Sequence, residues 1–418
     1  MSRLDELIKK LCPNGVEYKA LGEIFDTKNG YTPSKSKEEY WTNGTVPWFR
    51  MEDIRENGNI LSKAMQYVSE SAIKGSLFPA DSIIVATSAT IGQHALIKVP
   101  SLANQRFTYL VLKNNFKEKL DIMFIYYYCF KLDEYCKECL NQGNFASVDM
   151  KKFLKFKLPV PPLEVQAEIV RILDNFTELE KELEKELEKE LELRRKQYEY
   201  YRDLLLDFKD VHAGGTNAYS VPWLADMLHE LCPDGVEYKA LGEFANISRG
   251  KIMSKDYLKE NIGEYPVYSS QTENNGQMGS ISTYMYDGEY LTWTTDGANA
   301  GTVFFRSGKF SITNVCGLID VKNSNIIPKF LYYYLYKETP NHVKAGMGNP
   351  KLMSNVMSNI KLPVPPLAVQ RRIVHILDRF DALCNDLTNG LPAEIALRRK
   401  QYEFYRDKLL SFKELKEA

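Results

Sequence analysis

The sequence predicts an α+β protein in which two mixed α/β domains alternate with two long helices. Three observations support this fold class. The motif LCPNGVEYKALGE at residues 11–23 returns as LCPDGVEYKALGE at residues 231–243. The segment at residues 157–176 returns at residues 361–380 with 15 of 20 positions identical. Strand-like runs and turn residues fill the segments between these motifs, which predicts a pseudo-twofold internal repeat.

The repeats divide the 418-residue chain into five parts, and such a length suits two or three domains. Gly214 and Gly215 indicate a surface linker between the halves. The predicted parts are a first domain at 1–157, a first long helix at 158–209, a linker at 210–221, a second domain at 222–361 and a second long helix at 362–418. We call the first and second domains the first and second head.

Within each head, strand-like runs precede a helix that closes the segment. That helix contains Phe124–Tyr128 in the first head and Phe330–Tyr334 in the second, in matching sequence positions. Met1–Leu11 is predicted to be the start of an amphipathic helix. The clearest predicted strands are Ser82–Thr87, Phe107–Leu112, Tyr290–Thr294, Thr302–Arg306 and Cys316–Val321.

The first long helix contains the tetrapeptide EKEL three times in succession, at residues 180–191. This tract has no glycine, proline or β-branched residue, so local propensity favours a continuous helix. Pro161 and Pro162 suit its first turn, where a missing N–H costs nothing. Leucines at 179, 183, 187 and 191 recur every four residues, which predicts one apolar helix edge that needs a partner.

The second long helix is the natural partner. Residues 194–209 return at residues 398–413 with 13 of 16 positions identical, and both helices have the same spacing between their repeated ends. Two matched helices in one chain predict an intramolecular antiparallel coiled coil. Residues 389–392, Asn-Gly-Leu-Pro, are expected to break or kink the second helix.

Catalytic motifs are missing from both halves. The sequence has no GxxxxGK[ST] phosphate loop, no HExxH and no GxSxG, and its five histidines are scattered. Cys136 and Cys139 form a CxxC without a second pair, so we expect no metal site. The seven cysteines lack a disulfide framework, and the longest apolar run, 122–130, is too short to cross a bilayer. These features predict a cytoplasmic, non-catalytic protein.

The order of the motifs resembles the specificity subunits of type I restriction–modification systems. The residues that carry the resemblance are LPVPPLxVQ, RRKQYEYYRD and CPxGVEYKALGE, each present twice, and the likeness spans essentially the whole chain. The resemblance implies that the heads are target recognition domains, each reading one half of a split DNA sequence. It also implies that the coiled coil sets the gap and docks two modification subunits. S-adenosylmethionine, ATP and Mg²⁺ are then expected in the modification and restriction subunits, with no cofactor in this chain.

The sequence by itself indicates DNA binding only weakly, because the net charge is −1. Base reading needs polar and basic side chains in loops near a groove. The candidates in the first head are Lys28, Tyr31, Arg50, Ser88, Thr90, Gln93, Asn104, Gln105, Arg106, Asn141 and Asn144. The candidates in the second head are Arg249, Lys251, Ser269, Ser270, Gln271, Thr294, Thr295, Asn299, Asn314, Asn349 and Lys351. Each also suits an ordinary turn or an internal hydrogen bond.

The repeated helix segments carry basic and aromatic residues that suit either a helix seam or a docking site for a protein partner. The candidates for spacing and docking are Leu183, Leu187, Leu191, Arg194, Arg195, Tyr198, Tyr201, Arg398, Arg399, Tyr402 and Tyr405. Two alternatives stay open: a single-chain DNA modification enzyme, and a coiled-coil scaffold that binds no DNA. The target bases, the gap length and the presence of a functional nuclease subunit do not follow from the sequence.

Overall fold

The computed structural model describes residues 2–141, 146–208, 221–344, 349–385 and 390–415. Contacts divide the chain into two compact units. The first unit combines Met1–Lys185 with Ala396–Ala418, and the second spans Glu186–Ile395. Each unit therefore contains one head and parts of two long helices. The head boundaries derived from the sequence repeats rest on a different criterion and stay a prediction.

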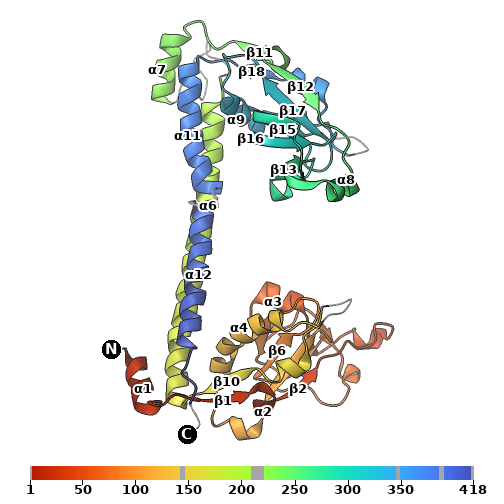
Figure 1. Ribbon diagram of the computed structural model, residues 1–418, viewed down its shortest axis with the longest axis vertical. Coiled ribbons are helices and arrows are strands. Elements are labelled where there is room, and N and C mark those ends of the chain that lie inside the picture. The colour runs from red at the N-terminus through yellow and green to blue at the C-terminus, as the bar shows by residue number, and fades with distance from the viewer. Residues whose placement is uncertain (1, 142–145, 209–220, 345–348, 386–389, 416–418) are drawn as a thin grey trace. The chain divides into compact units, whose positions relative to one another are not determined.

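The first unit is built on a five-stranded sheet (Figure 1). Its strand order is β2 (Phe25–Asn29), β9 (Phe107–Leu112), β6 (Ser82–Ala86), β7 (His94–Ile97) and β4 (Ile60–Leu61). All neighbours are antiparallel except β4 and β7. A second sheet has the order β5 (Tyr67–Val68), β3 (Val46–Phe49) and β8 (Leu102–Ala103). The helices are α1 (Arg3–Leu11), α2 (Leu21–Ile24), α3 (Met51–Asn57), α4 (Ile122–Glu138) and α5 (Met150–Phe153), with 3₁₀ turns at Glu38–Tyr40, Glu70–Ala72 and Asn114–Phe116.

Both faces of strand β6 are buried, which explains why its sequence is continuously apolar. Ile83 and Val85 belong to the same core as α4, whereas Ile84 and Ala86 belong to the core shared with the three-stranded sheet. Successive side chains on a strand point to opposite faces, so one short run supplies both cores. The five-stranded sheet is therefore the middle layer of the first head.

The second unit is built on a six-stranded sheet. Its strand order is β12 (Ala245–Arg249), β17 (Cys316–Val321), β15 (Tyr286–Thr294), β16 (Val303–Ile312), β13 (Ile262–Tyr268) and β14 (Gln277–Ile281). Only β13 and β16 run parallel to each other. The helices are α7 (Pro222–Leu231), α8 (Lys255–Glu260), α9 (Pro328–Glu338) and α10 (Ser354–Ser358), with 3₁₀ turns at Leu241–Glu243, Glu273–Gly276 and Thr339–His342.

All five predicted strands are present. The runs at 107–112 and 316–321 match β9 and β17 end to end, and β6 is one residue shorter than predicted. Strands β15 and β16 are longer than predicted because they form one long hairpin, with Asp287 opposite Lys309 beyond the apolar part. Polar residues in that extension concealed it from a search for apolar runs.

The repeated motifs pair with each other inside each unit. Strand β1 (Glu17–Ala20) is antiparallel to β10 (Lys157–Val160), and β11 (Tyr238–Ala240) is antiparallel to β18 (Lys361–Pro363). The register is equivalent, since the tyrosine of GVEYKA faces the first proline of LPVPP in both. In each unit the two motifs therefore form one two-stranded sheet, which we call the support; it connects the head to the start of α6 or α11.

A buried glutamine explains the end of the motif LPVPPLxVQ. The amide nitrogen of Gln166 donates to the carbonyls of Pro161, at 2.6 Å, and Lys119, at 2.8 Å. Its oxygen accepts from the backbone N–H of Asp121, at 2.8 Å, where α4 begins. Gln370 makes the equivalent three bonds in the second unit. Each glutamine thus fixes the head's closing helix to the start of a long helix.

Helix α6 (Leu163–Leu205) is one continuous helix of 43 residues, whereas the second repeat forms α11 (Leu367–Asn385) and α12 (Leu391–Leu409). The interruption between α11 and α12 agrees with the predicted break, although residues 386–389 lie outside the described ranges. Pro161 and Pro162 precede α6 instead of occupying its first turn. The Pro162 carbonyl accepts from the N–H of Gln166 at 3.1 Å and so starts the helix.

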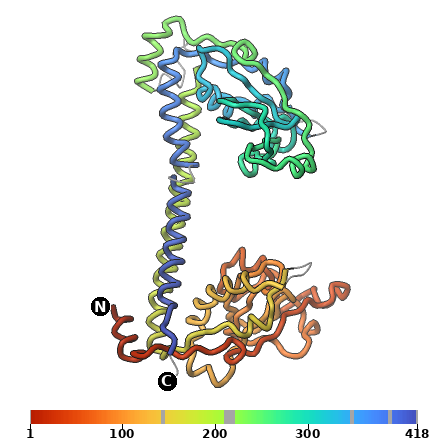
Figure 2. Tube along the Cα trace, in the orientation of Figure 1, coloured from red at the N-terminus to blue at the C-terminus, as the bar shows by residue number. Residues whose placement is uncertain are grey.

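Inside the first unit, the start of α6 packs along α12 (Figures 1 and 2). The rings of Phe176 and Tyr405 lie 6.5 Å apart, and Glu184 is paired with Arg399. Since residue numbers rise on one helix as they fall on the other, the two helices run in opposite directions here. Inside the second unit, the end of α6 packs on α11, with Tyr201 stacked 5.7 Å from Phe380.

The predicted leucine edge is only partly correct. Leu179 is 62% exposed and Leu183 is 36% exposed, whereas Leu187 and Leu191 are half-buried. Four residues exceed one helical turn by about 40°, so a four-residue repeat drifts around the helix. The buried or half-buried positions instead follow a spacing of four and three residues, which averages the 3.5 residues of a coiled-coil seam. The positions that follow this spacing are Leu173, Thr177, Glu180, Glu184, Leu187, Leu191, Arg194 and Tyr198; Glu190 and Gln197, each one residue before a seam position, are half-buried as well.

The last segment of each repeat completes the other repeat's unit. Leu410 is buried in the core of the first unit, and the ring of Phe412 lies 6.3 Å from Phe124. Phe208 is buried in the core of the second unit, with its ring 6.4 Å from Phe330. Residues 194–209 and 398–413 are nearly identical because each segment packs on the equivalent closing helix of one head, α9 and α4 respectively.

Candidate nucleic-acid interface

Loop residues from four segments of the first head meet at one end of its sheet. Thr32 is hydrogen-bonded to Gln105, and the carbonyl of Arg106 accepts from the N–H of Thr87 at 3.0 Å. The carbonyl of Thr87 in turn accepts from the N–H of Val148 at 2.9 Å. The side-chain nitrogen of Asn141 donates to the carbonyl of Val148 at 3.3 Å. These bonds connect the predicted residues near positions 28–31, 88–93, 104–106 and 141 into one cluster.

A cleft of about 770 Å³ opens beside this cluster in the first head. Trp41 and Trp48 line it and pack edge to face, with ring centroids 5.0 Å apart. The guanidinium of Arg50 lies 5.7 Å from the Trp48 ring, and its buried Nε has no hydrogen-bond partner. Of the predicted residues, Arg50, Asn104, Gln105 and Arg106 all line the cleft. Aromatic faces beside cationic and amide groups are suited to nucleobases.

Several other candidates of the first head have internal partners. The Tyr31 hydroxyl donates to the carbonyl of Ala72 at 3.2 Å and accepts from the N–H of Lys74 at 2.7 Å. Asn104 accepts from the N–H of Arg106 at 3.0 Å, so its oxygen shapes the turn. The remaining candidates are the exposed Lys28 and Asn141 and the half-buried Ser88, Thr90 and Gln93. Asn144 lies outside the described residues.

In the second head, hydrogen bonds likewise connect the predicted loops. Lys251 pairs with Thr313, whose hydroxyl lies 3.1 Å from that of Ser269. The side-chain nitrogen of Asn299 donates to Thr272 at 3.0 Å. The backbones of Asp296 and Lys351 form an isolated antiparallel bridge, and Arg249 lies 3.3 Å from the sulfur of Met353. The exposed candidates in this cluster are Arg249, Lys251, Gln271, Asn299, Asn314, Asn349 and Lys351, with Ser269 and Ser270 half-buried.

Thr294 and Thr295 do not belong to this surface, which corrects the sequence prediction. Both are fully buried. The Thr294 hydroxyl donates to the carbonyl of Asn299, and that of Thr295 donates to the carbonyl of Val315 at 2.9 Å. They follow the buried run of β15, so their hydroxyls satisfy backbone groups at the strand end. The sequence alone does not show whether a polar residue at the end of an apolar strand, such as Thr294, faces solvent or the core.

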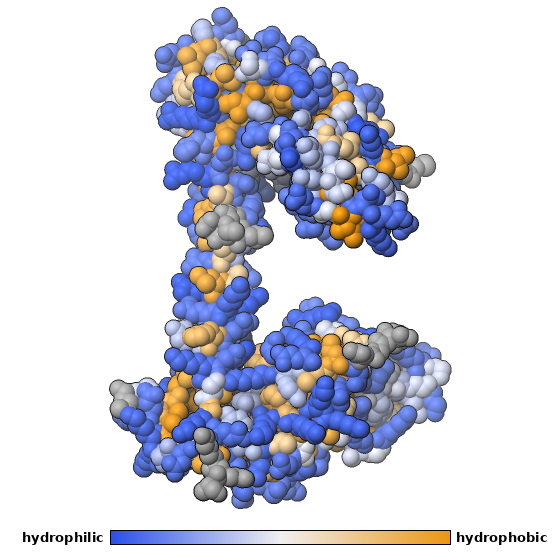
Figure 3. Space-filling view, in the orientation of Figure 1, coloured by the Kyte–Doolittle hydropathy of each residue, from blue (hydrophilic) through white to orange (hydrophobic). Residues whose placement is uncertain are grey.

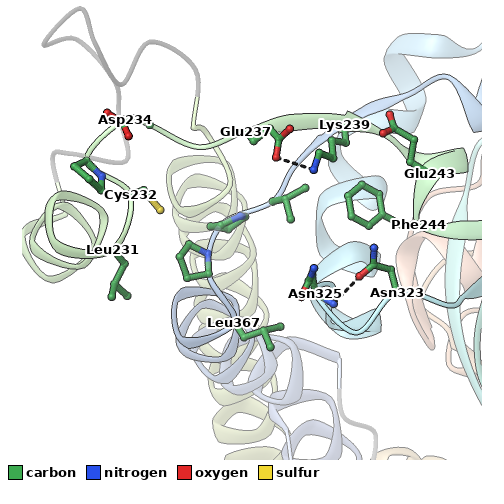
Figure 4. Close-up of a pocket in the computed structure, with 15 residues that line it drawn as sticks. Leu231, Cys232, Asp234, Glu237, Lys239, Glu243, Phe244, Asn323, Asn325 and Leu367 are labelled. Carbon is green, nitrogen blue, oxygen red and sulfur yellow. Dashed lines mark hydrogen bonds and ion pairs between the residues drawn. The ribbon is translucent and has the colours of Figure 1, made fainter.

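The support of the second head encloses a hollow of about 550 Å³. Figure 4 shows its walls: the CPDGVEYK motif on one side, the start of α11 with Leu367 on another, and Asn323 and Asn325 opposite. Lys239 forms an ion pair at 2.7 Å with Glu237, two residues earlier in the same segment. In the first unit the chain's own C-terminal segment pairs with the equivalent motif, since Val16 is bridged to Glu414. These residues support the head and are separate from the predicted loops.

The predicted docking residues fall into two groups. Tyr198 is 9% exposed, and the half-buried Tyr402 lies 2.8 Å from Thr177, so both belong to the helix seam. Tyr201 and Tyr405 keep 36% and 43% of their surface exposed. Arg195, Arg398 and Arg399 are exposed. Arg194 forms an ion pair with Glu190, and Arg399 with Glu184. The repeated sequence alone could not distinguish the tyrosines that pack between the helices from those that face solvent.

The exposed aromatics form a matched pair of patches. Tyr200 and Tyr201 contact edge to face at 5.4 Å and 74°, and Phe404 and Tyr405 do so with the same distance and angle. Tyr200 and Phe404 are 64% and 62% exposed. Figure 3 shows hydrophobic residues in orange at several places on the otherwise blue surface of the long helices; tyrosines do not appear orange on this hydropathy scale. We call Tyr200–Tyr201 and Phe404–Tyr405 the two aromatic pairs.

Histidine, cysteine and acidic residues are not arranged for metal binding within the described residues. His94 is fully buried, and its Nδ1 lies 2.6 Å from Asp133. Burial raises the pKa of the Cys136 thiol to about 12. Among the described residues, no helix combines the length and apolar character needed to cross a membrane.

Comparison with known proteins decides the family. The model of the type I restriction modification DNA specificity domain matches residues 13–193 and 233–397. The chain belongs to this family. The matched ranges contain both supports and all but the first residues of each head, and they end before the repeated segments 194–209 and 398–413. The family resemblance is therefore confirmed.

Relatives of this specificity family cover the whole architecture. The EcoprrI specificity subunit of Escherichia coli is 41% identical over 399 residues, which are 93% of each chain. A putative type I specificity subunit of Mycoplasma pneumoniae is 39% identical over 66% of this chain and 94% of its own. A chain from a structural study of type I system assembly and conformational transition has a TM-score of 0.65 at 17% identity, covering 96% and 98%. The HsdS subunit of Thermoanaerobacter tengcongensis has a TM-score of 0.52 at 16% identity, covering 96% and 97%.

Proposed function

We propose that this chain is the DNA-recognition subunit of a type I restriction–modification complex and that each head reads one half of a bipartite target. The observation that carries the proposal is the contrast within the repeat. The supports, the buried glutamines and the helix ends are nearly identical in the two halves. The loop clusters at the sheet ends differ in sequence, as expected of two surfaces that read different bases.

Each loop cluster has the groups that duplex DNA requires. Exposed lysine and arginine side chains supply phosphate contacts, and exposed Asn and Gln amides match base edges in the major groove. The cleft with Arg50 and Arg106 is the base-reading centre of the first head. The cluster from Arg249 to Lys351 has the same role in the second.

The long helices form an intramolecular antiparallel coiled coil, which sets the gap between the two half-sites. The seam spacing of four and three residues on α6 and the opposed contacts with α12 in the first unit support this arrangement. The equivalent contacts that the exchanged helix ends make inside each unit support the pseudo-twofold internal repeat. The EKEL tract is the part of α6 whose length determines the gap.

Two modification subunits dock on this frame through the two aromatic pairs, and restriction subunits join the complex. Exposed aromatic residues are enriched in protein interfaces, and two equivalent patches suit two copies of one partner. S-adenosylmethionine, ATP and Mg²⁺ belong to those partners. In this scheme the specificity chain itself is non-catalytic.

The test is methylome sequencing of a host that expresses this chain with its modification subunit. The proposal predicts one bipartite motif with an unspecified gap, present only when both chains are expressed. Methylation by the chain alone would instead favour a single-chain enzyme, and no motif with both chains present would favour a scaffold.

A further inference from the structure

An arginine without an acidic partner is buried beneath an exposed turn of the second head. Arg306, on β16, is 3% exposed, and its guanidinium is held 3.6 Å from the ring of Tyr268 and 4.3 Å from that of Phe304. Its Nε donates to the Thr292 hydroxyl at 3.2 Å and its Nη2 donates to the carbonyl of Asn275 at 2.8 Å. Within the described residues it forms no ion pair with a carboxylate, and desolvation lowers its pKa from the ordinary value.

The turn that Arg306 holds has an uncommon backbone. Asn274 and Asn275 both adopt left-handed conformations, with φ of 49° and 52°, and Gly276 follows with φ of 77°. A Cβ on Gly276 would lie 3.0 Å from Nη2 of Arg306 and 3.1 Å from the carbonyl oxygen of Gln271. Glycine is therefore required there, and the arginine keeps the two asparagines directed outward at the tip.

The side chains of Asn274 and Asn275 are exposed, and the turn adjoins the loop cluster of the second head. The side chain of Asn299, from the loop after β15, donates to Thr272, which directly precedes the turn. The N–H of Ser269 donates to the carbonyl of Gly276 at 3.0 Å. A buried cation without a counterion and two left-handed asparagines are both costly, and they coincide at one exposed tip. An approaching polyanion would supply the missing negative charge.

We propose that the Asn274–Asn275 turn reads an A·T pair of the second half-site and that Arg306 is its positioning residue. The inference rests on the proposed function and names the reading element of that head. An Asn amide can accept from the N6 amino group of adenine and donate to its N7 in the major groove. Adenine is therefore the base that this turn is expected to recognise. Arg306 lies behind the turn, where it fixes the backbone and adds positive potential toward the DNA.

The experiment replaces both asparagines with glycine and maps the methylome of the complex with the modification subunit. Glycine adopts the left-handed conformation freely, so Asn274→Gly with Asn275→Gly keeps the turn and removes only the amides. We expect the first half-site to stay intact. At an A·T pair of the second half-site, methylation of sites with a substituted base should rise by about 10-fold, as for loss of one bidentate contact.

Asn43→Gly is the matched control, because Asn43 is also left-handed, with φ of 52°, but lies in the first head. It should leave the second half-site unchanged. Arg306→Lys should relax the same A·T pair as the double glycine variant, whereas a purely structural arginine would lower methylation at all sites equally. An unchanged second half-site, or relaxation only at G·C pairs, overturns the inference. Absence of any bipartite motif for the wild-type complex would instead refute the proposed function.

Discussion

The hydroxyl oxygens of Thr177 and Tyr402 lie 2.8 Å apart, although 225 residues separate them in the chain. Thr177 is on α6, in the first repeat, and Tyr402 is on α12, in the second repeat. Tyr127 of the first head donates to Asp174 at 2.7 Å, one turn before Thr177. These hydrogen bonds join the first head, α6 and α12. Residues of the C-terminal segment therefore complete the first unit.

The seam spacing predicts which leucines stabilise the first unit. Leu173 is fully buried, so Leu173→Ala should lower the free energy of unfolding by about 2–5 kcal/mol. Leu179 is 62% exposed, and Leu179→Ala should change it by less than about 0.5 kcal/mol. Chemical denaturation of the two variants measures both values. Equal losses would mean that the leucines at four-residue spacing form the interface after all.

Glu180 predicts a pH dependence of the seam. Desolvation raises the pKa of this half-buried carboxyl, and the nearby Glu184 raises it further. A raised pKa in the folded state means that the ionised form destabilises the fold at neutral pH, and the cost disappears as pH falls below the ordinary value of about 4.3. Glu180→Gln should therefore raise Tm at pH 7, and its advantage should vanish near pH 4. The exposed Glu182→Gln is the control, with no advantage at pH 7; equal gains for both variants would contradict the seam assignment.

The aromatic pairs predict where modification subunits bind. Replacing Tyr200 and Tyr201 with alanine should weaken one of two binding sites by at least about 10-fold, and replacing Phe404 and Tyr405 should weaken the other. Titration calorimetry with purified modification subunit gives the number of sites and each affinity. Leu179→Ala, which removes an exposed apolar side chain outside both pairs, should leave two equal sites. Two undisturbed sites in both aromatic variants would exclude the aromatic pairs as the docking surface.

The EKEL tract predicts the gap of the recognition sequence. Deleting Glu184 to Leu187 removes ~6 Å of helix and turns one end by ~40°. DNA advances ~3.4 Å and turns ~35° per base pair, so the unspecified gap should shorten, most simply by one base pair. Methylome mapping of the deletion strain reads both half-sites and the gap. Glu184→Gln with Leu187→Ala alters the same tract at constant length, and its gap should equal that of the wild type. An active deletion complex with an unchanged gap contradicts the spacer role.

The sequence predicted the repeat architecture well because the supporting motifs are nearly identical. Gln166 and Gln370 end a duplicated motif, and their identical bonds show why that motif recurs. The seam was missed at Glu180 and Glu184, because polar residues at seam positions hide a 3.5-residue pattern behind the more regular leucines.

The interface was predicted less completely. Residue type alone could not distinguish the buried Thr294 from the exposed Asn299, since both follow one apolar strand. The turn at Asn274 and Asn275 was not among the sequence candidates, because the contact that singles it out comes from Arg306, which is 31 residues beyond Asn275 on strand β16. The only sequence signal for it was the Asn-Asn-Gly run, which is typical of a tight turn.

Replacement of one head tests the central claim most directly. Residues 24–156 would be exchanged for the corresponding segment of another member of the family, with the supports and helices left unchanged. The measurement is the methylome of a host that expresses the hybrid with the modification subunit. The account predicts that one half of the methylated sequence changes while the other half and the gap are retained. A change in both halves, or in neither, would contradict it.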